Sequence, residues 1–205
     1  MNAPTPDIRK GRKYDQVLEG ARQVFMVDGF EGASVDDIAK AAGVSKATLY
    51  SYFPDKRLLF MEVARIECNR QANIAVHDID TSDPPRVVLT KAATSLMYFF
   101  LSDIGQQVFR ISVAETARFP ELGHEFYQCG PMVVHDILTG YINIAIDRGE
   151  LAVDDVHLAA HQLPELCKAD LFPKLIFGVQ SKFSDAEIDR VVKGAVDMFM
   201  ARYGT

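Results

Sequence analysis

The stretch SVDDIAKAAGVSKATLYSYF, residues 34–53, decides how this chain folds. Ser34 stands before a run with helical apolar spacing, and Asp37, three positions later, completes the outline of a capping box. Gly43 follows that run and tolerates the positive φ that a tight turn between two crossing helices needs. The first half of the stretch therefore predicts a short helix that ends in a turn.

A second short helix is predicted over residues 46–53. Ser45 can cap its start, and Pro54 ends it because the residue before proline disfavours the α conformation. Leu49 and Phe53 are four residues apart and are expected to pack inward. This spacing is typical of a helix-turn-helix, whose second helix lies in the major groove of DNA. Two short amphipathic helices with a glycine turn also occur in many all-α proteins, so the spacing alone leaves DNA binding open.

The sequence around this stretch favours DNA binding over a purely structural pair of helices. An amphipathic helix is predicted from about residue 14 to 28, and Gly29 stops it. Over roughly residues 12–60 the pattern resembles the N-terminal domain of the tetracycline-repressor (TetR) family. The positions that carry the resemblance are Phe30, Ile38, Ala39, Gly43, Val44, Tyr50, Phe53, Lys56 and Leu59. The resemblance implies a transcription regulator, with a DNA-binding domain at residues 1–56 and a ligand-binding and dimerisation domain at residues 57–205.

We expect the DNA contacts to come from the second helix and its neighbours. Lys46 is the best candidate for a contact with guanine, and Lys56 suits a phosphate clamp. Tyr52 can reach a phosphate or pack against the following helix. No Arg, Asn or Gln lies in the second helix, so DNA shape is expected to carry part of the specificity. The candidate DNA-binding residues are Ser34, Ser45, Lys46, Ala47, Thr48, Tyr50, Tyr52, Lys56, Arg12 and Lys13.

Charge is distributed unevenly along the chain, whose formal net charge is −6. Residues 1–60 carry nine Lys and Arg against eight Asp and Glu, a net charge of +1, and residues 61–205 carry −7. A basic arm precedes the first helix and can contact phosphates or the minor groove, or remain a solvated tail. Its basic residues are Arg9, Lys10, Arg12 and Lys13.

Composition is that of a globular protein with a real core, at 48% hydrophobic and 24% charged residues. The sequence has no run of about 18 uncharged apolar residues, so no membrane helix is predicted. It has no apolar N-terminal segment, so no secretory signal is predicted. The three cysteines are widely spaced and odd in number, which argues for the reducing cytoplasm. We expect no cofactor, no metal and no membrane partner.

Beyond residue 54 the chain is predicted to be helical, which makes it an all-α protein of about nine helices without strands. The linker is clearest at residues 81–85. Ser184 and Glu187 form a capping box for the last helix. The predicted helices in this part are about 55–77, 86–103, 104–119, 120–149 with a break near Gly130 and Pro131, 156–177 and 185–203.

The C-terminal part is similar to the regulatory domain of AefR-like members of the family over about residues 85–200. The runs that carry this similarity are residues 109–123, Phe126-Tyr127, Gly130-Pro131 and 148–151. The family usually encloses an apolar effector pocket between such helices, although each lining residue can equally fill core. The candidate pocket residues are Met97, Phe100, Phe109, Glu115, Phe126, Tyr127, Met132, His135, His161 and Phe172.

Catalysis and metal binding are only weakly indicated. His157 and His161 have the spacing of a metal-binding pair, but no third ligand with motif spacing follows. Glu115, Glu121 and Glu125 can in principle pair as acid and base, yet 28 acidic residues make such coincidences common. No phosphate loop or nucleophile motif is present, so we do not expect an enzyme. An all-helical enzyme with a purely structural helix-turn-helix is the alternative from another class.

The last two helices are predicted to form a homodimer through a four-helix interface. Such a dimer would hold two recognition helices about 34–36 Å apart on a palindromic operator. The predicted interface residues are Leu171, Leu175, Ile188, Val192, Ala195, Val196 and Phe199. We expect a repressor that a small, mostly apolar effector releases from DNA, with an activator or a ligand-independent regulator as the alternative.

Overall fold

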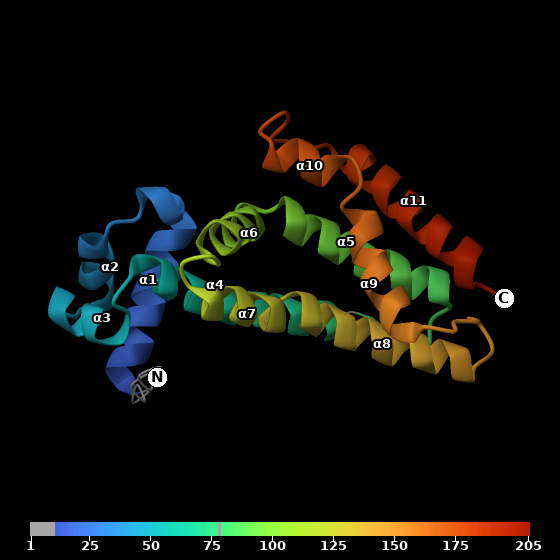
Figure 1. Cartoon of the computed structure of the whole chain (residues 1–205), viewed down its shortest axis with the longest axis horizontal. Coiled ribbons are helices and arrows are strands. Elements are labelled where there is room, and N and C mark those ends of the chain that lie inside the picture. Colours follow the sequence, from blue (N-terminus) through green and yellow to red (C-terminus); the bar gives the residue numbers. More distant parts are fainter. Residues whose placement is uncertain (1–10, 78) are drawn as a thin grey trace.

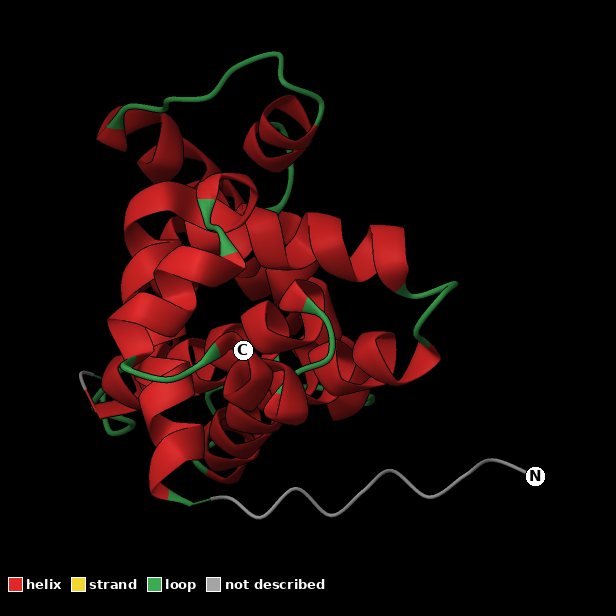
Figure 2. Cartoon of the chain, turned by 90° about the vertical axis from the view of Figure 1, so that its left-hand side faces the viewer, coloured by secondary structure: helices red, strands yellow, loops and turns green. Residues whose placement is uncertain are grey.

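A computed structural model describes residues 11–77 and 79–205, and the side chains of all of these except residues 68, 71–77 and 122. This part of the chain forms eleven helices, with an isolated bridge between Leu151 and Gly204. Figure 2 shows it as helices joined by loops. The helices are α1 (Arg12–Gly32), α2 (Val35–Ala42), α3 (Lys46–Tyr52), α4 (Lys56–His77), α5 (Pro85–Leu101), α6 (Asp103–Glu115), α7 (Pro120–Cys129), α8 (Pro131–Asp147), α9 (Val156–Cys167), α10 (Leu171–Ile176) and α11 (Asp185–Tyr203). The all-α prediction is confirmed.

The helices form a small end and a larger body (Figure 1). Helices α1 to α3 make up the small end, and α4 runs from it into the body, where it packs against α7 and α8. Helix α9 crosses between α5 and α8, and α11 packs on α5 and α9. Helix α6 lies between the two parts and contacts both α1 and α4.

Two hydrophobic clusters hold these helices together. The first joins α1, α2 and α3 to the start of α4, and it also takes in Val108 and Ile111 from α6. The second joins α5, α8, α9, α10 and α11 around residues such as Met97 and Leu163, which are fully buried. Since residues on both sides of position 56 share the first cluster, a domain boundary at that residue stays a prediction.

Several helix ends differ from the predicted ones by a few residues, and one predicted helix is wrong as a whole. Helix α6 ends at Glu115 and not near residue 119, and α1 continues to Gly32 beyond a kink at Gly29, whose φ is 68°. The predicted break near Gly130 is present, and it separates α7 from α8.

The single helix predicted over residues 156–177 is wrong, because the chain forms α9 and α10 instead. Asp170, between them, has a φ of 65°, and this left-handed conformation cannot continue a right-handed helix. The predicted capping box at Ser184 is present in full.

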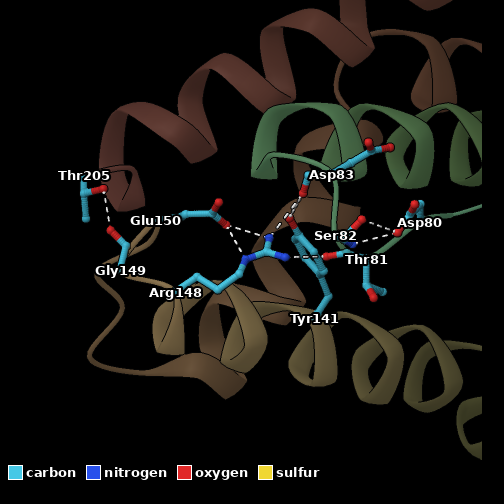
Figure 3. A network of polar contacts seen from close by, with 9 residues as sticks. All are labelled: Asp80, Thr81, Ser82, Asp83, Tyr141, Arg148, Gly149, Glu150 and Thr205. Atoms are coloured by element: carbon cyan, nitrogen blue, oxygen red, sulfur yellow. Dashed lines mark hydrogen bonds and ion pairs between the residues drawn. The ribbon is translucent and has the colours of Figure 1, made fainter.

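The predicted linker is fixed to the body by the end of α8 (Figure 3). Arg148 donates hydrogen bonds to the carbonyl oxygens of Thr81 at 2.8 Å and Asp83 at 3.2 Å. Its guanidinium also pairs with Glu150, and the Tyr141 hydroxyl lies 3.4 Å from the Asp83 carbonyl oxygen. These bonds join the start of α5 to the loop that follows α8.

One stretch, Gly123–Asp147, is long and apolar enough to cross a membrane by length and composition alone. Helices α5 and α6 together pass the same test as a pair bent by 69°. Core helices of globular proteins also meet this criterion, and α8 contributes the buried side chains Leu138 and Ile142 to the second hydrophobic cluster. Core packing therefore accounts for part of the apolar content, since 28% of the most apolar window is buried within the single chain.

Candidate DNA interface

Three local devices shape the turn between α2 and α3. The Ser34 hydroxyl accepts a hydrogen bond from the backbone N–H of Asp37 at 3.0 Å and caps α2. Gly43 ends α2 with a φ of 63°, the left-handed conformation that favours glycine. The Ser45 hydroxyl accepts a hydrogen bond from the N–H of Thr48 at 3.1 Å and caps α3. The predicted helix-turn-helix is therefore present, with both caps and its turn.

The inner face of this unit is packed tightly against α1. Leu49 and Phe53 are buried with Tyr14 and other α1 residues in the first hydrophobic cluster. Gly20 of α1 meets the end of α2 so closely that an added Cβ would lie 2.5 Å from the backbone nitrogen of Ala42. This close approach of two backbones fixes the angle between α1 and the helix-turn-helix.

The outer face of α3 carries the predicted contact residues. Ser45, Lys46, Ala47 and Tyr50 are exposed there, and Thr48 is half-buried. The Lys46 ammonium forms an ion pair with Asp36 of α2, and both side chains are more than half exposed. The face is therefore open to solvent, and a DNA contact by Lys46 stays a prediction that would require the ammonium to leave Asp36.

Tyr52 lies partly in the helix packing and not wholly on the outer face. Its ring meets the Tyr14 ring edge-on at a centroid distance of 5.7 Å, so it packs against α1. Tyr14 also stacks on Phe53 at 5.5 Å and donates a hydrogen bond to Glu62 of α4 at 2.8 Å. Burial and then this bond to Glu62 hold the pKa of Tyr14 above its ordinary value, so its hydroxyl stays a donor.

Lys56 has a structural role that the sequence did not indicate. Its ammonium donates hydrogen bonds to the carbonyl oxygens of Phe30 at 2.8 Å and Ala33 at 3.0 Å, at the end of α1. It also lies 4.4 Å from the centre of the Phe30 ring. A cation in this place is favoured by the negative end of the helix. A phosphate contact by Lys56 stays a prediction, and it would compete with these carbonyls.

Replacing Lys56 with alanine is expected to lower the free energy of unfolding by about 1.5–3 kcal/mol, because two charge-assisted hydrogen bonds are lost. Urea unfolding followed by circular dichroism measures this change. Lys13→Ala is the control, since Lys13 is exposed and should change stability by less than about 0.5 kcal/mol. Equal stability of the Lys56 and Lys13 variants would contradict the capping role.

The start of α1 carries the remaining candidate DNA contacts. Arg12 and Lys13 are exposed in its first turn. Arg12 also lines a shallow groove between α1 and α2. Arg9 and Lys10 of the predicted arm lie outside the described residues.

Contacts through α6 and Arg57 connect this DNA-facing end to the body. Gln107 of α6 accepts a hydrogen bond from the backbone N–H of Phe30 at 3.1 Å. Arg57, at the start of α4, pairs with Asp55 and donates to Glu115, the last residue of α6, at 2.7 Å. The bond from Arg57 also holds the pKa of Asp55 below its ordinary value. Any shift of α6 therefore acts on both α1 and α4.

The ten candidate pocket residues lie in several different surroundings, so a pocket shared by all of them stays a prediction. Glu115 belongs to the Arg57 junction. Met97 is fully buried in the second core, whereas Phe126 packs against the first. Tyr127 is exposed. Helical spacing predicts that such side chains are buried on folding. It does not distinguish a residue that lines a pocket from one that fills the core.

Some of the other candidates form an aromatic cluster between α5, α6 and α10. The Phe172 ring lies 5.2 Å from the Phe109 ring and 5.9 Å from the Phe100 ring, measured between centroids. All three side chains are half-buried, as is Met132 at the start of α8. The cluster is therefore a plausible wall for an apolar molecule and not a closed core.

The candidate histidines lie at the contact between α8 and α9. His135 is buried and stacks on His161 at 4.5 Å and on His157 at 5.2 Å between ring centroids. Its Nδ1 lies 2.9 Å from Asp136, and its Nε2 lies 3.1 Å from Nδ1 of His157. Within the described residues, no group of three or more His, Cys, Asp or Glu side chains is arranged to hold a metal ion. His135 therefore has polar partners at both ring nitrogens, Asp136 and His157, whereas His161 contacts it by ring stacking.

An open cavity of about 450 Å³ lies elsewhere, between α4, α7 and the start of α8. Sequence reasoning missed it, because its polar residues lie on separate helices and only the fold brings them together. The one feature of the sequence that could have indicated the cavity is a row of polar residues on α4 at positions 62, 65 and 69. The lining residues are Glu62, Arg65, Asn69, Glu125, Gln128, Cys129 and Val133.

The predicted dimer residues are corrected by their burial. Each has at most 5% of its surface exposed within the single chain. They pack in the second hydrophobic cluster, where α11 lies against α5 and α9, so their side chains cannot meet a second copy. The seven residues are Leu171, Leu175, Ile188, Val192, Ala195, Val196 and Phe199.

The fold and the site define a helix-turn-helix protein with an all-helical body, and comparison with known proteins assigns its family. The family model for tetR-family bacterial regulatory proteins matches residues 17–63, and the model for the C-terminal domain of AefR-like transcriptional repressors matches residues 87–205. The chain belongs to the TetR family, which is a family of transcription regulators and not a class of enzymes.

Solved structures agree over the whole length of the chain. A TetR-family regulator from Mesorhizobium loti is 26% identical, with a TM-score of 0.81, and the match covers 97% of this chain and all of that one. The flavonoid-responsive regulator FrrA is 31% identical, with a TM-score of 0.69, and covers 95% of this chain and 98% of its own. Both have the same arrangement of helices as the protein described above.

Curated relatives match over only part of the chain. The transcriptional repressor AcnR from Corynebacterium glutamicum is 39% identical over 59 residues, which is 29% of this chain and 31% of AcnR. The chain thus aligns with about a third of the length of that relative. The biofilm-operon negative regulator IcaR from Staphylococcus aureus is 25% identical over 99 residues, 48% of this chain and 51% of IcaR.

Proposed function

We propose that this chain is a transcription repressor that binds a palindromic DNA operator as a homodimer and releases it when a small effector binds the body. The observation that carries the proposal is the open outer face of α3, with Lys46 and Tyr50 exposed on a doubly capped helix-turn-helix. The repressor names of the matched relatives AcnR and IcaR support it. As a DNA-binding regulator, the protein would act in the cytoplasm.

The dimer is proposed to form through exposed side chains of α9 and α11, in place of the buried residues named above. Leu158 on α9 is 51% exposed and Met198 on α11 is 62% exposed, and the two helices are neighbours. Gly194 and Ala201 flank Met198 on the outer face of α11, and their small size lets a second helix approach closely. Two copies of this face form a self-complementary, twofold interface.

Replacing Met198 with glutamate is expected to weaken the dimer by at least about tenfold, because a charge would be buried at the centre of an apolar contact. Sedimentation velocity measures the dissociation constant. Val113→Glu on α6 is the matched control, since Val113 is 65% exposed and lies outside the proposed face. A Met198 variant that remains as dimeric as the control would place the interface elsewhere.

Release from DNA is proposed to pass through α6. An effector that displaces α6 acts on Phe30 through Gln107 and on Arg57 through Glu115, which changes how α1 and α4 hold the helix-turn-helix. The ligand shifts the protein toward the released conformation because it binds that conformation more tightly than the DNA-bound one. The size of the shift is set by the difference between the two affinities. The name of FrrA supports a small aromatic effector, and the cluster of Phe100, Phe109 and Phe172 offers aromatic contacts.

Hydroxyl-radical footprinting on the DNA upstream of the chain's own gene tests the arrangement. The account expects two protected segments related by a dyad, with centres about 10 base pairs apart or a multiple of that. A single protected segment would contradict the twofold complex. A thermal-shift screen of small aromatic compounds tests for the effector, and a uniformly flat result would contradict an effector-responsive body.

A further inference from the structure

The open cavity between α4 and α7 has a direct connection to the recognition helix. Glu62 forms part of its wall and is only 15% exposed. The Glu62 carboxylate accepts the hydrogen bond from Tyr14 at 2.8 Å, and the Tyr14 ring packs on Tyr52 and Phe53 at the end of α3. One hydrogen bond thus separates the cavity wall from the aromatic residues that orient α3.

Glu62 is also held from the body side. Arg65, one turn further along α4, donates to it through Nε at 2.8 Å and Nη2 at 2.7 Å. Both side chains line the cavity, so a molecule in the cavity meets the carboxylate and the guanidinium together. The position of Glu62 therefore depends on what occupies the cavity. A change in that position alters the hydrogen bond that Tyr14 donates to Glu62.

The lining chemistry selects the kind of ligand. The two carboxylates Glu62 and Glu125 against the one guanidinium of Arg65 give the wall a formal charge of −1, which disfavours an anion. Carboxylates accept hydrogen bonds, and amides such as Gln128 both accept and donate, so the wall suits hydroxyl or amino donors. A volume of about 450 Å³ is in the range of small-molecule sites.

We propose that this cavity is a second control site for DNA release, separate from the aromatic cluster, and that it takes a neutral or cationic small molecule bearing hydroxyl or amino donors. A ligand that donates to Glu62 draws the carboxylate away from Tyr14. Tyr14 then no longer holds Tyr52 and Phe53 in place, the end of α3 is released from α1, and operator affinity falls. The inference rests on the proposed function, because it adds to the proposed release a second path, from Glu62 of α4 through Tyr14, beside the path through α6.

Cys129 allows the cavity to be filled without knowing the ligand. Its thiol is half-buried in the wall, where it donates to the carbonyl oxygen of Phe126 at 3.7 Å. Burial raises the pKa of this thiol, so labelling with N-ethylmaleimide is best done at mildly alkaline pH. The substrate is the full chain with Cys68→Ala and Cys167→Ala, in which Cys129 is the single cysteine.

Labelled protein is expected to bind its operator at least about tenfold more weakly than unlabelled protein. The control carries the single cysteine at the exposed position Thr90→Cys on α5 and lacks Cys129, and its label should leave affinity unchanged within about twofold. Adding Tyr14→Phe should abolish the effect of the Cys129 label, because the hydroxyl that senses Glu62 is gone. An effect that persists with Tyr14→Phe would show general disruption and overturn the proposal.

The ligand class is tested by a matched pair of probes, tyramine and 4-hydroxyphenylacetate, which differ mainly in the sign of their charge. At about 10 mM, tyramine is expected to slow labelling of Cys129 at least threefold and 4-hydroxyphenylacetate is not. Equal or reversed protection would overturn the ligand class. A Cys129 that does not react in the folded protein, or whose label leaves operator affinity unchanged, overturns the site alone. Failure of the unlabelled chain to bind any operator would instead remove the proposed function, and this inference with it.

Discussion

Replacing Gly20 with alanine is expected to lower the free energy of unfolding by about 2–3 kcal/mol and to weaken operator binding. The added Cβ would lie 2.5 Å from the backbone nitrogen of Ala42 and 2.7 Å from its Cα. Backbone atoms cannot turn aside as a flexible side chain can, so α1 and α2 have to separate. Urea unfolding and operator titration measure the two effects.

Gly140→Ala is the matched control for this prediction. Gly140 lies within α8, and an added Cβ there meets nothing within 4 Å. Alanine is a better helix former than glycine, so this variant is expected to gain about 0.5–1 kcal/mol. If both variants gain stability, the close approach of α1 and α2 does not constrain the helix-turn-helix.

Replacing Lys46 with glutamate is expected to weaken operator binding by at least about 100-fold while changing stability by less than about 1 kcal/mol. Lys46 is exposed on α3, where the substitution exchanges a cation for an anion facing the DNA. The ion pair with Asp36 that it removes is more than half exposed and contributes little to stability. Fluorescence anisotropy with labelled operator DNA measures the affinity.

The matched control is Lys91→Glu on α5. Lys91 is also an exposed lysine that pairs with one aspartate, Asp83, but it lies in the body. The two variants change the net charge equally, so a loss of affinity confined to the Lys46 variant shows that α3 faces the DNA. Similar affinities for the two variants would argue against α3 as the recognition helix.

Local chemistry made much of the small end predictable. Ser34, Gly43 and Ser45 act on backbone groups within four residues of themselves, so their roles follow from sequence spacing alone. The break at Pro131 is equally local. Asp170 was missed because no general rule places an aspartate in the left-handed conformation at that point.

Long-range contacts account for what was not predictable. The apolar face of α11 indicated that residues such as Val192 and Phe199 are covered, but only the fold shows that α5 and α9 cover them. For Lys56, which the sequence predicts as a phosphate contact, spacing along the chain could not indicate its hydrogen bonds to the carbonyls of Phe30 and Ala33. Glu115 likewise has its partner, Arg57, 58 positions away in the sequence.

DNA binding by this chain is tested most directly by the salt dependence of its affinity for DNA from upstream of its own gene. Contacts between basic side chains and phosphates release counterions, so the logarithm of the binding constant falls linearly with the logarithm of the salt concentration. The account predicts tight binding at about 50 mM salt and a loss of at least about 100-fold by about 200 mM. No binding of this DNA at low salt would contradict it.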